Sequence, residues 1–137
     1  GLVQPYLLGS ANLTLTVAQS GSVIECGAAE DFVLPAITAD LIGTNYEFVV
    51  TTTATSLTIT AATGDLLKGG VSAMSTTAGA ENDAFAADGT DDLIISMNGT
   101  TTGGIIGSWV KLTAASATSW LVRGGTIGSG TLVTCFS

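Results

Sequence analysis

The sequence predicts an all-β fold: a β-sandwich of jelly-roll or Greek-key type with an extended N-terminal arm. Three observations lead to this prediction. The chain is rich in Thr, Ser, Ala and Gly, with 18 Gly in 137 residues; Thr packs well on a pleated surface, and Gly suits tight turns. Short apolar or alternating runs recur at the 8–12-residue spacing of sandwiches and barrels. No window of 11 or more residues shows helical periodicity.

Links of mixed length between these runs favour a jelly roll or Greek key over an up-and-down barrel. The predicted strands are residues 13–17, 23–26, 32–34, 46–50, 57–60, 66–67, 93–97, 109–113, 120–123 and 131–136. Residues 40–43 fit one helical turn, and residues 73–89 a long loop anchored by Phe85. Asn98-Gly99 is typical of a tight hairpin turn.

The chain divides into an N-terminal arm, residues 1–12, and a sandwich domain, residues 13–137. The arm is apolar and irregular, and its large side chains need a surface to lie on. Two arrangements are open: a strand on the edge of its own domain, or an arm that grips a neighbouring protein. The candidate contact residues are Leu2, Val3, Tyr6, Leu7 and Leu8.

Charge is scarce: charged residues make up 10% of the chain, against about 25% in ordinary soluble domains. A surface of small polar side chains suits a protein largely covered by partners, so we expect an oligomer or assembly component. The alternative is an acidic monomer kept soluble by its net charge of −8. The only basic residues, Lys68, Lys111 and Arg123, are expected to be scattered, which argues against binding to nucleic acids or anionic membranes.

The sequence predicts no enzyme and no cofactor. Histidine is absent, which excludes Ser-His-Asp and Cys-His nucleophiles and histidine-based metal sites. Carboxylate pairs can cleave glycosides without histidine, but nothing in the sequence pairs the available carboxylates, and aromatic residues make up only 6% of the chain. The candidates for such a pair are Asp31, Glu47, Asp65, Asp91 and Asp92.

The segment around residues 81–92 is acidic, and carboxylate oxygens are ligands that Ca²⁺ prefers. Its carboxylates are Glu81, Asp83, Asp88, Asp91 and Asp92. Their spacing is not that of an EF-hand, so we predict a solvated acidic loop and no metal site, with calcium as the alternative.

Two cysteines and two tryptophans are the remaining residues that could have a functional role. Cys26 and Cys135 both lie in strand-like runs and could be neighbours, but we expect two buried free thiols. Trp109 and Trp120 are predicted to fill the core. The alternative is that they are exposed and stack on sugars.

Several short motifs occur in a familiar order. Gln19-Ser-Gly-Ser-Val-Ile24 precedes Phe32-Val-Leu-Pro35, and Ser119-Trp-Leu-Val-Arg-Gly124 closes the series. From about Thr14 to Gly124 the chain resembles small β-rich structural proteins of tailed bacteriophages, and is most similar to capsid decoration (cement) proteins.

The resemblance implies a non-enzymatic virion protein at the capsid surface that binds and stabilises the assembled capsid. Its partner would be the major capsid protein, and it would act as a homo-oligomer, a trimer. The apolar arm would contact the capsid or a neighbouring subunit. The alternative within the resemblance is a tail or head fibre domain that binds a host-surface carbohydrate. The family offers no catalytic, cofactor-binding or metal-binding residues to carry over.

Overall fold

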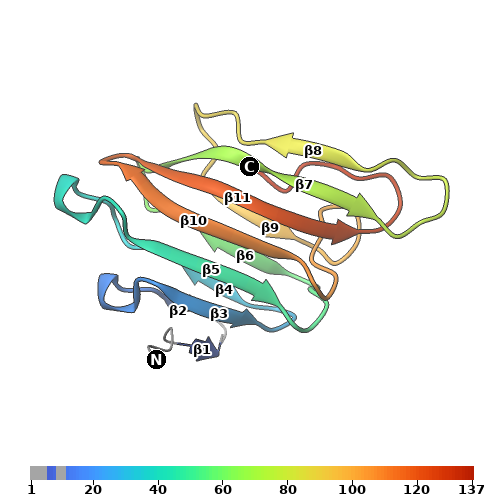
Figure 1. The fold of residues 1–137 in the computed structure, drawn as a ribbon, viewed down its shortest axis with the longest axis horizontal. Coiled ribbons are helices and arrows are strands. Elements are labelled where there is room, and N and C mark those ends of the chain that lie inside the picture. Colours follow the sequence, from blue (N-terminus) through green and yellow to red (C-terminus); the bar gives the residue numbers. More distant parts are fainter. Residues whose placement is uncertain (1–5, 9–11) are drawn as a thin grey trace, which may run out of the picture.

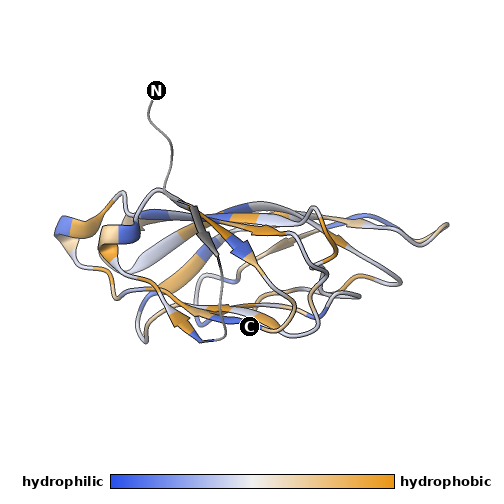
Figure 2. Ribbon diagram, turned by 90° about the horizontal axis from the view of Figure 1, so that it is seen from below, coloured by the Kyte–Doolittle hydropathy of each residue, from blue (hydrophilic) through white to orange (hydrophobic). Residues whose placement is uncertain are grey.

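A computed structural model describes residues 6–8 and 12–137, with side chains from residue 12 onward. It confirms the all-β prediction. Two mixed sheets, one of seven strands and one of four, pack face to face as a sandwich (Figures 1 and 2). Among the described residues the only helices are two single 3₁₀ turns, η1 (Val17–Gln19) and η2 (Ala39–Leu41); the second matches the helical turn expected near residue 40. No helix in this part of the chain has the length and apolar character needed to span a membrane.

The seven-stranded sheet faces the viewer in Figure 1, with the four-stranded sheet behind it. In spatial order, its strands are β1 (Tyr6–Leu8), β3 (Ser22–Cys26), β5 (Asn45–Val50), β10 (Trp109–Ser116), β11 (Ser119–Gly128), β7 (Leu66–Ser75) and β8 (Asp83–Ala86). The four-stranded sheet contains β2 (Leu13–Thr14), β4 (Asp31–Val33), β6 (Leu57–Thr60) and β9 (Ile94–Met97).

The strand connections correct the predicted jelly-roll or Greek-key topology, which is built from antiparallel strands. Of the nine strand pairings among the residues that the structure describes, five are parallel and four antiparallel. From β3 to β6 the chain passes from one sheet to the other after every strand. As a result β3 and β5 become parallel neighbours in one sheet, and β4 and β6 in the other.

Three local predictions were also wrong. Residues 73–89 are not one long loop, because β7 continues to Ser75 and β8 occupies Asp83–Ala86. The Asn98-Gly99 turn does not close a hairpin, since β9 pairs with β6 in one sheet and β10 begins in the other. Residues 131–136 form no strand and contribute one isolated bridge, between Phe136 and Ile95.

The core lies between the sheets and is formed by the alternate residues of each strand that point inward. Its largest side chains are Trp120, Tyr46, Phe32 and Phe48, all at most 1% exposed. The rings of Tyr46 and Trp120 lie 6.0 Å apart, and those of Phe32 and Phe48 5.3 Å apart. Phe85 packs against this core from β8, as expected of an anchor.

Candidate functional site

The outer face of the seven-stranded sheet is the broadest regular surface of the sandwich, and it lies toward the viewer in Figure 1. Its side chains are those that alternate with the buried positions of each strand. They are Val23 and Glu25 of β3; Asn45, Glu47 and Val49 of β5; Trp109, Lys111 and Thr113 of β10; Leu121, Arg123, Gly125 and Ile127 of β11; Lys68, Gly70, Ser72 and Met74 of β7; and Ala84 and Ala86 of β8. We call this set the outer face.

The two tryptophans have different environments. Trp120 points into the core and is 0% exposed, as predicted. The prediction for Trp109 was wrong: it lies on the outer face and is 40% exposed. Position 109 alternates with the buried Val110 and Leu112, so the indole points away from the core. Only Trp109 is therefore available to a ligand or partner.

The three basic residues are not scattered, which corrects the prediction. Lys68, Lys111 and Arg123 are all exposed on the outer face, on three strands that lie side by side. Lys111 pairs with Arg123 in the β10–β11 ladder, and Lys68 is paired with Leu121. The Arg123 guanidinium donates a hydrogen bond from Nη1 to the Val122 carbonyl oxygen at 2.8 Å.

The same face carries an acidic half. Glu47 of β5 pairs with Lys111 of β10, and Glu25 lies on β3, one strand further out. Charge thus changes sign across the sheet, from carboxylates on β3 and β5 to cations on β10, β11 and β7.

Two shallow hollows adjoin on the β8 side of the outer face. One, of about 500 Å³, is lined by Arg123, by Gly124 and by the facing parts of β7 and β8. The other, of about 380 Å³, is lined by residues that include Trp109, Met74 and Ile127. Ser72 borders both. Both are open depressions rather than enclosed cavities, so they suit protruding side chains of a partner better than a buried substrate.

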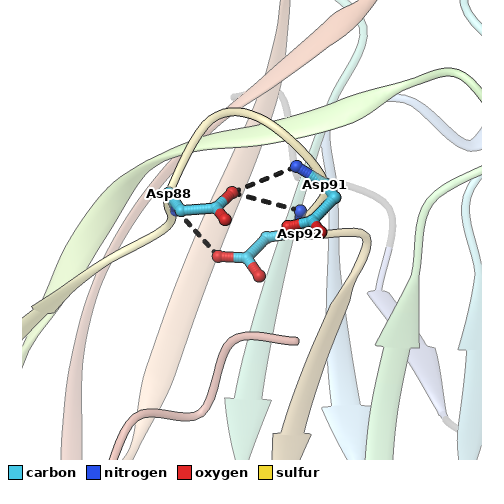
Figure 3. Close-up of side chains that lie close together, drawn as sticks. All are labelled: Asp88, Asp91 and Asp92. Atoms are coloured by element: carbon cyan, nitrogen blue, oxygen red, sulfur yellow. Dashed lines mark hydrogen bonds between the residues drawn. The ribbon is translucent and has the colours of Figure 1, made fainter.

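Asp88, Asp91 and Asp92 form the cluster shown in Figure 3, with carboxylate oxygens within 4.8 Å of one another. The Asp88 carboxylate accepts backbone N–H hydrogen bonds from Thr90 at 2.8 Å and from Asp91 at 3.1 Å. The Asp88 N–H in turn donates to Asp92 Oδ2 at 2.7 Å. These bonds explain the cluster as a turn stabilised by its own side chains.

The same hydrogen bonds shift the pKa values of Asp88 and Asp91 in opposite directions. Backbone N–H donors stabilise the ionised form of Asp88 and hold its pKa below its usual value. The pKa of Asp91 is raised because this side chain shares a hydrogen bond with Asp88 and faces its negative charge. Of the five carboxylates considered for calcium, Glu81 and Asp83 lie outside this cluster.

The other carboxylates considered for catalysis lie apart. Asp31 is on β4 and accepts a hydrogen bond from Thr58 Oγ1 at 2.5 Å. Glu47 is on β5 in the opposite sheet. Asp65 is buried, and its Oδ2 accepts the Ile37 backbone N–H at 2.9 Å, which ties two loops together. Of the five candidates, the structure brings only Asp91 and Asp92 together.

Both cysteines are buried free thiols, as expected. Burial raises the pKa of Cys26 to about 12, assisted by the nearby Glu30 charge, and raises that of Cys135 to about 11. Neutral, inaccessible thiols of this kind are poor nucleophiles.

Of the predicted arm contacts, Leu2 and Val3 lie outside the described residues. Tyr6, Leu7 and Leu8 form β1, whose backbone pairs in parallel with β3, and their side chains are not described. No protein-family model matches the chain, and neither the characterised proteins nor the solved structures compared with it contain a match.

Proposed function

We propose that this chain is a non-enzymatic virion structural protein: a decoration protein on the capsid surface that binds and stabilises the assembled capsid as an oligomer. Its partner would be the major capsid protein, and the oligomer would be the trimer that the family resemblance implies. A protein that binds only the assembled lattice stabilises that lattice by its binding free energy. Several linked subunits gain further from effective concentration.

One observation carries the proposal: apolar side chains are exposed on opposite surfaces of a sandwich that bears little charge. On one side, Trp109 and Met74 are 40% and 53% exposed on the outer face. On the other, the strands of the four-stranded sheet expose one large apolar side chain, Val33 of β4, at 37%. A bridging protein needs a contact on each side, one for sister subunits and one for the lattice.

The arm remains the proposed capsid or subunit contact, through Leu2, Val3, Tyr6, Leu7 and Leu8. The experiment is cosedimentation of the purified chain with assembled capsids and with unassembled capsid protein. Full-length chain should sediment with capsids only. Deletion of residues 1–5 leaves β1 in place to pair with β3, whereas deletion of residues 1–12 removes it. Both truncations should fold, as judged by circular dichroism, and lose capsid binding.

Two results would count against these proposals. Full capsid occupancy by the 1–5 deletion would remove Leu2 and Val3 from the contact, and full occupancy by the 1–12 deletion would remove the arm altogether. Failure of the full-length chain to bind assembled capsids would overturn the decoration function itself.

The alternative function, a fibre domain that binds a host-surface carbohydrate, is supported by the exposed Trp109, because an exposed indole can stack on a sugar ring. Glycan-array binding that is lost on Trp109→Ala would favour this alternative. Trp120 has no part in that test, because it is buried.

A further inference from the structure

We propose that the outer face is the surface on which copies of this chain join, with the basic half of one copy packed against the acidic half of the next. This inference rests on the proposed oligomeric function and names the surface that function would use. Each copy then uses the same face, so the contact is isologous, and a two-fold axis closes it into a dimer in place of the trimer that the family resemblance implies.

The outer face carries residue types that are characteristic of protein interfaces. Trp, Met and Arg are enriched in interfaces, and Trp and Arg dominate their binding energy. Here Trp109 of β10 and Met74 of β7 line one of the two hollows, and Arg123 of β11 lines the other. Leu121, 37% exposed, extends the apolar area toward the other end of the face.

Charge complementarity selects a second copy as the occupant. The chain has three basic residues and eleven acidic ones, and the outer face holds all three basic residues with only two of the carboxylates, Glu25 and Glu47. Two copies with a net charge of −8 each repel one another. A contact that opposes this repulsion needs cations on at least one side. All the basic side chains of the chain, Lys68, Lys111 and Arg123, lie on the outer face. Because that face also carries carboxylates on its other half, it is complementary to itself.

The size of the face fits the same occupant. Six strands at a spacing of about 4.8 Å span roughly 24 Å, and strands of four to ten residues are about 13–33 Å long. The flat projection is therefore roughly 600 Å², before side-chain relief is added. A standard interface takes about 800 Å² from each partner, so one copy could cover most of the face.

The test is sedimentation equilibrium of the full chain over a range of concentrations, with circular dichroism to show that each variant folds. Lys111→Gln with Arg123→Gln removes two positive charges from the face. Thr14→Glu with Ser96→Glu makes the same change in net charge on exposed positions of the opposite sheet. The first pair should weaken self-association about 30-fold or more, as expected for central interface residues. The control pair should change it less than about threefold.

A reciprocal variant separates specific pairing from general charge effects. Lys111→Glu with Arg123→Glu should abolish association, and addition of Glu47→Lys should recover a measurable part of it by exchanging the signs of the two halves. A wild-type chain that stays monomeric, or one whose association is unaffected by the first pair, overturns the proposal. Binding of a glycan at Trp109 by a monomer also overturns it.

Capsid cosedimentation of the same variants shows whether only the proposed subunit interface is wrong or the proposed decoration function is wrong as well. Variants that associate like the wild type and still bind capsids would leave the decoration function intact and place the subunit interface elsewhere.

Discussion

Trp109 and Gly125 are directly paired across the β10–β11 ladder, and the indole lies over the glycine. A Cβ added at Gly125 would lie 3.1 Å from Trp109 Nε1 and 3.8 Å from two further atoms of the same ring. The missing side chain lets the indole lie down on the sheet beside the hollow that it lines. A larger residue at position 125 would lift it.

The two tryptophans should therefore differ in fluorescence. In dilute solution, Trp109→Phe leaves only the buried Trp120, whose emission should be blue-shifted and resistant to quenching by iodide. Trp120→Phe leaves the exposed Trp109, which should be readily quenched, and Gly125→Val should increase that quenching further. Equal quenching of the two single-tryptophan variants would contradict the assignment.

Gly99 and Gly64 allow the cost of a positive φ to be separated from the cost of steric overlap by an added side chain. Both have positive φ, 79° and 93°, which costs an Ala residue about 1–2 kcal/mol. Around Gly64 there is open space, whereas a Cβ at Gly99 would overlap the Ala54 carbonyl oxygen. Gly64→Ala should lower the free energy of unfolding by about 1 kcal/mol, and Gly99→Ala by about 3 kcal/mol or more. Urea denaturation measures both, and similar losses would show that overlap at residue 99 has no effect.

Asp88 and Asp91 should titrate in opposite directions from an ordinary aspartate. Carboxyl-carbon NMR titration should give Asp88 a pKa below 3.8, and Asp91 a pKa above it. Because Asp88 has a lowered folded-state pKa, its contribution to stability is present above pH 3.8 and is lost as the pH falls further. Asp88→Asn should lower the pKa of Asp91, because it weakens the hydrogen bond that the two side chains share and removes the facing charge. An unchanged Asp91 titration would show that the two carboxyl groups are not coupled.

The buried thiols should make the protein sensitive to alkali. The pKa values of Cys26 and Cys135 rise from 9.0 to about 12 and about 11 in the folded chain, because burial disfavours the thiolate. A raised folded-state pKa gives stability that is complete below pH 9 and is lost as the pH rises toward 11–12. Urea midpoints should fall steeply above pH 9, and less steeply in the Cys26→Ala, Cys135→Ala variant. Rapid alkylation of either thiol in the native protein at pH 8 would contradict the burial.

Much of the strand content could be predicted, because alternation along a strand reflects burial directly. The runs at 46–50 and 57–60 correspond to β5 and β6, and the run at 120–123 lies within β11. The alternation also carries information that the prediction overlooked: Trp109 precedes the buried Val110 and Leu112 in a period-two pattern, so it belongs to the exposed set. The second half of β7 was missed because Gly69-Gly70 resembles a turn, although both glycines remain paired with β11.

The sequence by itself determined that this protein is made of strands, which residues within most strands face inward, and that histidine chemistry is absent. Only the tertiary structure decided that five of the nine strand pairings in the described part of the chain are parallel, and that Lys68, Lys111 and Arg123 lie on one face. The reason is physical. Side-chain alternation specifies the two sides of a single strand, but the backbone hydrogen bonds that join strands are nearly the same for every residue type. The choice and direction of partners therefore depend on how the whole chain packs.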